Sequence, residues 1–157
     1  MKPLTPLLAM LMLTLSATCL AYENDHHHHA PQHNPLTQLT LNDGKKWSID
    51  DSLHLGMTQI KREIENNIDA IHHNTFTLAE YEKLAKNINT HLQYIFKHCA
   101  LPKAADEQLH HLLFSIMQAS EQMKSKEQPR QAAVTLIKAL EHYPKFFADN
   151  NWQALNH

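Results

Sequence analysis

Glycine is almost absent from this chain, which has two glycines among 157 residues. Because the tight turns of β proteins depend on glycine, this scarcity argues against a turn-rich β fold and favours long helices with short connections. It also leaves no glycine-rich phosphate-binding loop, and no Ser-His-Asp or Cys-His pairing stands in a recognisable context. We therefore do not expect an enzyme.

Cysteine is scarce as well, with Cys19 and Cys99 alone. Lys2, an uncharged apolar stretch over residues 7–15 and small residues before Ala21 predict a signal peptide over residues 1–21. The alternatives are an uncleaved membrane anchor and a lipoprotein that is lipidated on Cys19. Cleavage after Ala21 would leave Cys99 without a partner for an internal disulfide, in a protein that we expect to be periplasmic or secreted.

Positive charge is not in excess. Removing residues 1–21 takes away Lys2, which lowers Lys+Arg from 14 to 13 against 16 Asp+Glu and gives a formal charge of −3. Such a chain does not attract a phosphate backbone, so we expect no nucleic-acid partner. Residues 22–157 contain no long apolar run, so no stable membrane anchor is expected after cleavage. Nothing in the sequence identifies a protein partner.

Histidine is abundant instead, and all 14 histidines follow residue 21. Five of them lie close together in a polar, proline-containing stretch without periodicity: His26, His27, His28, His29 and His33. This composition predicts a flexible, His-rich lead-in over residues 22–47. Its neutral imidazoles can bind copper, zinc or nickel without a fold, although an incidental polar tail or a purification tag would have the same composition.

Apolar residues recur at helical spacing in four segments, near residues 50–74, 77–99, 103–126 and from 129 onward. Asp50 is a good N-cap, Thr77 and Glu80 match a capping box, and Pro129 suits a first turn, whereas Pro144 should break or kink its helix. The short connections predict an antiparallel up-down-up-down four-helix bundle over residues 48–157. The inward stripes are Leu53, Met57, Ile60, Ile64, Ile68 and Ile71; Tyr81, Leu84, Ile88, Leu92, Ile95 and Cys99; Ala105, Leu109, Leu112, Ile116 and Met123; and Ala133, Leu136, Ile137, Leu140 and Tyr143.

This topology lets us estimate which side chains share a level of the bundle. Counting from the turns gathers one set within about two turns of one end: Met57, His91, Ile95, His98, Cys99, His110 and His142. Met, Cys and His suit copper(I), and Cys and His also suit zinc. Asp106, one turn before His110, could orient that imidazole. Met57 and Cys99 are equally explained as apolar core residues.

A haem site is a further alternative. Met57 near the start of the first helix and His142 near the end of the fourth resemble the axial pair of b-type cytochromes built as four-helix bundles. No Cys-x-x-Cys-His motif is present, so covalent c-type attachment is excluded. Tyr143 and Pro144 crowd His142, which argues against haem b.

Several motifs together resemble a family of uncharacterised exported bacterial helical proteins: Gly44-Lys45-Lys46-Trp47, Asp50, Leu53-x-x-Gly56-Met57, Cys99-x-Leu101, Asp106-x-x-Leu109-His110 and Phe147-x-x-x-x-Trp152. The resemblance covers about residues 41–153 and implies a periplasmic helical bundle associated with copper and heavy-metal tolerance. The chain departs from the family where residues 148–151 replace an expected His-Pro-Gly, which puts the role of the terminal segment in doubt.

These observations lead us to expect a periplasmic metal-binding protein that buffers copper or confers tolerance to it. The expected metal ligands are Met57, Cys99 and His110, with His98 and His91 in reserve, and the His-rich tract would capture the ion. The alternatives are a metal-free structural or partner-binding bundle and, third, a b-type haem bundle.

Overall fold

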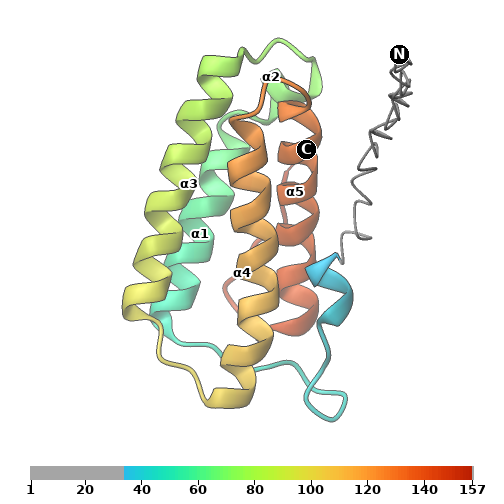
Figure 1. Ribbon diagram of the computed structural model, residues 1–157. Helices are drawn as coiled ribbons and strands as arrows, with labels where there is room; N and C mark the ends of the chain where they lie inside the picture. Colours follow the sequence, from blue (N-terminus) through green and yellow to red (C-terminus); the bar gives the residue numbers. More distant parts are fainter. Residues whose placement is uncertain (1–33, 157) are drawn as a thin grey trace, which may run out of the picture. The chain divides into compact units, whose positions relative to one another are not determined.

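The computed structural model describes residues 34–156, and the regular elements in this part of the chain are helical (Figure 1). A short 3₁₀ helix, η1 (Pro35–Gln38), precedes five α-helices: α1 (Asp51–Glu65), α2 (Ile68–His72), α3 (Leu78–His98), α4 (Lys103–Met123) and α5 (Pro129–Phe146). The expected all-helical class is therefore confirmed for these residues. The expected signal peptide with Cys19 lies outside them, as do the histidines of the tract, His26, His27, His28, His29 and His33.

The helix starts follow the signals in the sequence. The Asp50 carboxylate accepts from the backbone N–H of Leu53 at 2.7 Å. Thr77 and Glu80 form the reciprocal capping box, and Pro129 opens α5, where its missing N–H costs nothing. Each predicted N-terminal signal is thus confirmed. Asp50 and Thr77 satisfy backbone N–H groups that the first turn leaves free, and Pro129 removes one of them.

The first helix differs from the continuous helix expected over residues 50–74. It stops at Glu65 and resumes as α2 at Ile68. Asn67 lies at the break, where its backbone N–H donates to Ile64 O at 3.0 Å and its side chain donates to Glu63 O at 2.7 Å. Asparagine side chains compete for backbone groups in this way, and the two asparagines in succession account for the interruption.

Of the two effects expected of Pro144, a break or a kink, the break does not occur, because α5 continues to Phe146. Proline removes one N–H from the helix, but this one lies in the final turn, where few backbone bonds remain to be lost. Phe147 follows and is fully buried, and the Phe146 carbonyl accepts from the backbone N–H of Trp47 at 2.7 Å. These tertiary contacts hold the last turn of α5 in place.

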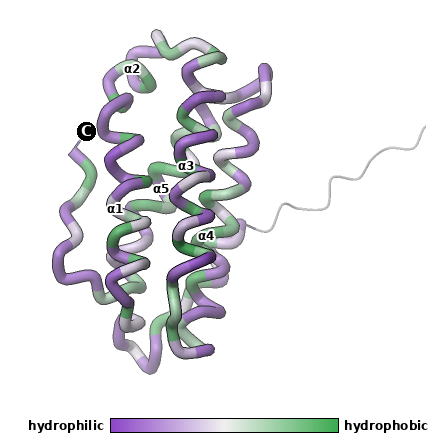
Figure 2. The backbone as a smooth tube through the Cα atoms, turned by 90° about the vertical axis from the view of Figure 1, so that its left-hand side faces the viewer, coloured by the Kyte–Doolittle hydropathy of each residue, from purple (hydrophilic) through white to green (hydrophobic). Residues whose placement is uncertain are grey.

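The core lies between α1, α3, α4 and α5, which run side by side (Figures 1 and 2). Helix α3 packs against both α1 and α4, and α4 packs against α5. Every residue of the predicted apolar stripes is buried except Cys99, which is half-buried. The helical periodicity of the sequence therefore identified the core correctly.

Gly56 lies where α1 packs closely against α3. A Cβ atom built at this position would overlap the side chain of Ile95 on α3. The absence of a side chain therefore lets the two helices come together beside Met57, as the glycine in the middle of an apolar stripe indicates.

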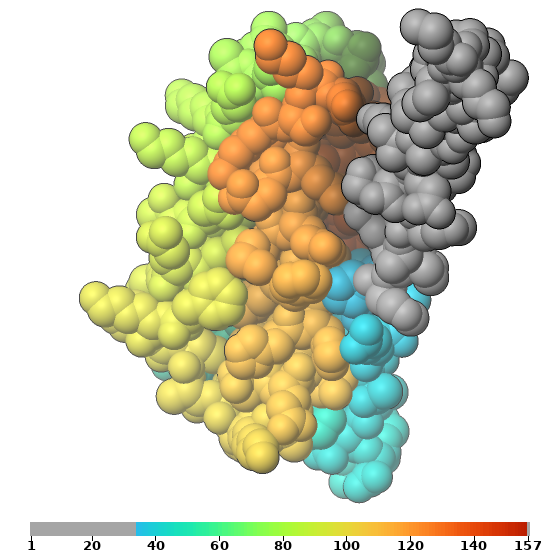
Figure 3. Space-filling model, in the orientation of Figure 1, coloured from blue at the N-terminus to red at the C-terminus, as the bar shows by residue number. Residues whose placement is uncertain are grey.

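Residues 35–47, which the composition places in the lead-in, pack against the helices. Leu36 and Leu39 are buried, and η1 packs on α4, where Gln108 Oε1 accepts from Thr40 N at 2.8 Å. Figure 3 shows this segment, in blue, lying against the side of α4. Residues 34–47 thus belong to the helical unit.

The chain after α5 returns along α1 (Figure 2). Ala148 N donates to Trp47 O at 2.8 Å, and Lys61 Nζ on α1 donates to Gln153 O at 3.0 Å. Trp152 packs edge-on against Tyr143, with the ring centroids 4.7 Å apart. We call residues 147–155 the C-terminal strap. Among the described helices, none combines the length and the apolar composition that crossing a bilayer requires.

Candidate functional site

Cys99 caps the C-terminal end of α3, next to the N-terminus of α1. One oxygen of Asp50 caps α1, and the other accepts from Ala100 N at 2.7 Å, so this carboxylate joins the two helix ends. Burial first, and then the charge and hydrogen bonding of Asp50 and the charge of Asp106, raise the pKa of the Cys99 thiol to about 12. The thiol is therefore protonated at neutral pH and is a poor nucleophile.

Cys99 lines a pocket of about 260 Å³ between α3 and α4, together with Ile95, Phe96, Asp106, Leu109, His110 and Leu113. Nδ1 of His110 donates to the backbone carbonyl of Asp106 at 2.8 Å and lies 3.5 Å from the Asp106 carboxylate. In the neutral imidazole, a proton on Nδ1 leaves Nε2 with a free lone pair. The pocket thus brings together two expected metal ligands, Cys99 and His110, and the expected orienting residue Asp106.

The other expected core ligands are not among the described residues that line this pocket. Met57 is fully buried in the core. Nε2 of His91 lies 3.6 Å from Glu63 on α1, and the exposed His98 packs against Tyr94, with the ring centroids 4.6 Å apart. In residues 34–156 no group of three His, Cys, Asp or Glu side chains is arranged to hold a metal ion.

His142, the residue considered for haem, lies on α5. Its Nδ1 donates to the Lys138 carbonyl at 2.8 Å, and its ring stacks on Phe146 with the centroids 6.4 Å apart. Its ring is therefore held along its own helix, while Met57, the other residue of that pair, is enclosed in the core.

A second polar cluster, which the sequence did not indicate, fastens the strap to the bundle. The Asp149 side chain is 2% exposed. It accepts from His54 Nδ1 at 2.8 Å, from the Tyr143 hydroxyl at 3.0 Å and from Asn151 N at 3.1 Å. Burial, followed by the Asp149 charge, raises the Tyr143 pKa. His54 and Asp149 are 95 positions apart, and the only hint in the sequence was that residues 148–151 depart from the family motif.

Comparison with protein-family models, with curated proteins and with solved structures gave no match to this chain. The resemblance to exported bacterial bundle proteins therefore stays a prediction from the motifs.

Proposed function

We propose that this chain is an exported copper-binding protein that acts in copper buffering or tolerance in the periplasm. The proposal includes a signal peptide over residues 1–21, a His-rich tract and an antiparallel up-down-up-down four-helix bundle. Three links support the antiparallel order. The start of α1 lies next to the end of α3, because Asp50 accepts from the backbone N–H of Ala100. It also lies next to the end of α5, because the backbone N–H of Trp47 donates to Phe146 O. At the opposite end of α5, Arg130 donates to Ile71 O in α2 at 2.9 Å.

The observation that carries the proposal is that Cys99 and His110 line one pocket. A soft thiolate beside an imidazole suits copper(I), which accepts as few as two ligands. Zinc, the alternative metal, prefers four ligands, and the described residues hold no group of three. The arrangement therefore favours copper(I) over zinc. Metal binding must displace the Cys99 proton, so affinity should increase with pH.

The His-rich tract would supply the first contact with the ion. Five imidazoles within residues 26–33 can bind copper without a preformed site. In this scheme the tract captures copper(I), and the pocket at Cys99 and His110 holds it.

Anaerobic titration with copper(I) against a competing chelator tests the pocket on a variant that lacks residues 22–33. The deletion stops before Asn34, because Asn34 caps η1 and Pro35 and Leu36 are buried. We expect tight binding of about one ion, lost in Cys99→Ala and weakened in His110→Ala. His73→Ala, an exposed histidine in the loop after α2, is the matched control. Equal binding by the Cys99→Ala, His110→Ala double variant and its parent would disprove the core site.

The alternative, a metal-free bundle that binds a protein partner, has one observation in its favour. Phe96, at the same pocket, is 52% exposed, and Phe114 on α4 is 46% exposed. If copper binding depends on the His-rich tract alone, this reading gains support. Titration with haem tests the third candidate, because a b-type site would produce a Soret band that Met57→Ala and His142→Ala abolish.

A further inference from the structure

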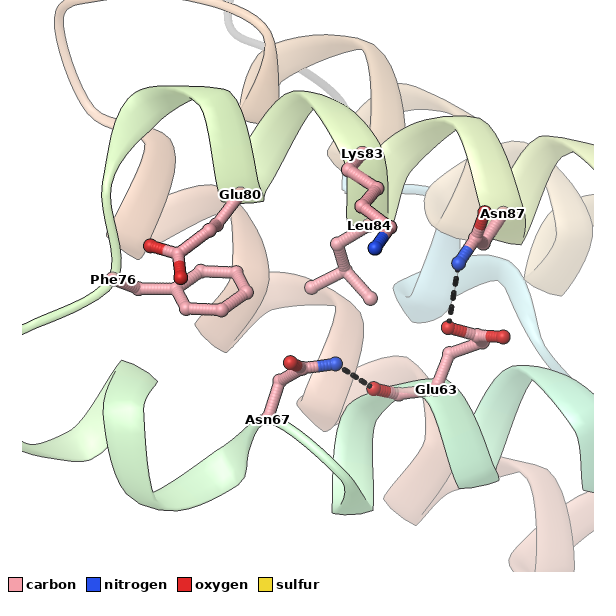
Figure 4. Close-up of a pocket in the computed structure, with 7 residues that line it drawn as sticks. All are labelled: Glu63, Asn67, Phe76, Glu80, Lys83, Leu84 and Asn87. Carbon is pink, nitrogen blue, oxygen red and sulfur yellow. Dashed lines mark hydrogen bonds between the residues drawn. The ribbon is translucent and has the colours of Figure 1, made fainter.

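A pocket of about 210 Å³ lies where α1 gives way to α2, facing the first turns of α3 (Figure 4). The helix break shapes its wall on the α1 side. Asn67 donates through Nδ2 to the backbone carbonyl of Glu63 at 2.7 Å, which fixes the amide and leaves Oδ1 as an acceptor. This pocket shares no lining residue with the one at Cys99.

Two carboxylates are fixed at the pocket by neighbouring donors. Glu63 reaches across to α3, where its Oε2 accepts from Asn87 Nδ2 at 3.0 Å. Glu80 Oε2 accepts from both the backbone N–H and the hydroxyl of Thr77, each at 2.7 Å. These hydrogen bonds lower the pKa of Glu80, so its carboxylate is ionised at neutral pH. Glu80 keeps its second oxygen for a ligand, and Oε1 of Glu63, which lies 3.6 Å from Nε2 of His91, keeps a lone pair for one.

Lys83 is the only ammonium group among the described residues that line this pocket. The lining has two carboxylates and one ammonium, so the pocket carries a net negative charge. The Nδ2 groups of Asn67 and Asn87 already donate hydrogen bonds to Glu63. Fixed acceptors therefore outnumber free donors, so a well-matched ligand must bring hydrogen-bond donors and positive charge.

The remaining wall is apolar. Figure 4 shows the Phe76 ring and the Leu84 side chain facing the same space, with the Lys83 amine beside Leu84. Phe76 is held edge-on against the buried Tyr81, with their ring centroids 4.8 Å apart. These side chains offer a short apolar surface next to the carboxylates. The volume is below the roughly 300–1,000 Å³ of drug-sized ligand sites, so the ligand must be small.

We propose that this pocket binds a small organic cation, a primary amine or guanidinium on a short alkyl chain. The charged end is recognised by Glu63 and Glu80, and the alkyl chain lies on Phe76 and Leu84. Lys83 repels such a ligand and reduces its affinity. The proposal uses neither Cys99 nor His110, so it stands or fails separately from the proposed function.

NMR titration of the ¹⁵N-labelled protein with n-butylammonium and n-butylguanidinium tests this inference, because the Asn67 and Asn87 side-chain amides report directly from the pocket. Butyrate and n-butanol are the anionic and neutral probes. We expect saturable shifts with the two cations alone. Glu63→Gln should weaken binding roughly tenfold or more, as expected for the loss of a hydrogen bond to a charged group. Glu82→Gln, the same change on α3 outside the pocket, should leave it unaltered.

Lys83→Gln provides a second test that does not depend on a buried group, because Lys83 is exposed. Removing this ammonium should tighten binding of both cations. Weaker cation binding in Lys83→Gln, equal affinity of Glu63→Gln and the unaltered protein, or a preference for butyrate would each overturn the proposal.

Discussion

Burial and the Asp50 and Asp106 carboxylates raise the pKa of the Cys99 thiol to about 12. Asp50→Asn should lower this pKa toward its ordinary value near 9, while asparagine keeps the N-cap of α1. At pH 8 the variant should therefore react faster with iodoacetamide, by about tenfold for each unit by which the pKa falls. Asp51→Asn in the first turn is the charge-matched control, and equal rates in both variants would refute the role of Asp50.

The same thiol makes stability depend on pH in a defined direction. Its pKa in the folded protein is above the ordinary value, so the folded state holds the proton more tightly. This contribution to the free energy of unfolding is fully present below pH 9 and is lost as the pH rises toward 12. Urea unfolding at pH 8 and pH 11 should show a smaller difference in Cys99→Ala than in the unaltered protein. If the free energy of unfolding changed equally between the two pH values in both proteins, the Cys99 thiol would not be the source of the pH dependence.

Two buried tyrosines should respond oppositely to loss of the hydroxyl. The Tyr81 hydroxyl finds no hydrogen-bond partner among the described residues, whereas the Tyr143 hydroxyl donates to Asp149 at 3.0 Å. Tyr81→Phe should raise the free energy of unfolding by about 1 kcal/mol, because an unpaired buried polar group is removed. Tyr143→Phe should lower it by about 1–3 kcal/mol. Chemical denaturation measures both, and a loss in Tyr81→Phe would show that its hydroxyl is satisfied.

At the scale of elements, Gly56 sets how closely α1 approaches α3. Gly56→Ala should destabilise the fold by about 1–3 kcal/mol, because the new Cβ overlaps Ile95. In an Ile95→Ala background the overlap disappears, and the same change should stabilise α1 by up to about 1 kcal/mol through helix propensity. A double-mutant cycle measured by urea unfolding separates these effects. The same cost in both backgrounds would mean that the helix contact is not responsible.

Helix starts and core stripes could be predicted from the sequence because both are local patterns. The Thr77 capping box and the apolar spacing through Ile60 and Ile88 depend on residues a few positions apart. The break at Asn67 was missed because two asparagines are only a weak signal against a strong stripe. The helix break predicted at Pro144 does not occur because the free-energy cost of a proline depends on how many helical hydrogen bonds follow it. Here few follow it, and contacts of the chain after Pro144 hold the last turn.

For the whole molecule, the candidate sites show which contacts between side chains could not be predicted from the sequence. Levels in the bundle could be estimated by counting from the turns, and Cys99 and His110 do line one pocket. Counting gives the level of a side chain but not which neighbours it faces, so it did not show that the core residue Met57 stays off the lining of this pocket. The pairing of His54 with Asp149 leaves no local pattern, because it joins residues 95 positions apart.

The pairing of His54 with Asp149 joins the first turn of α1 to the C-terminal strap. Breaking this pair should therefore loosen the strap first. Asp149→Asn removes the charge that accepts from His54, Tyr143 and Asn151, at a cost of about 1–3 kcal/mol. Opening of the C-terminal strap should then become roughly tenfold to a hundredfold more frequent. Hydrogen exchange at the Ala148 amide, which donates to Trp47 O, should accelerate accordingly.

Amides in the middle of α3 should exchange as before, because the strap can open while the core between α3 and α4 stays packed. Asp69→Asn, an exposed aspartate in α2, is the matched control and should leave the Ala148 amide unchanged. If Asp149→Asn accelerated exchange equally in the strap and in α3, the strap would not open separately. Asp149 would then be part of the cooperative core, and the strap would unfold together with the bundle.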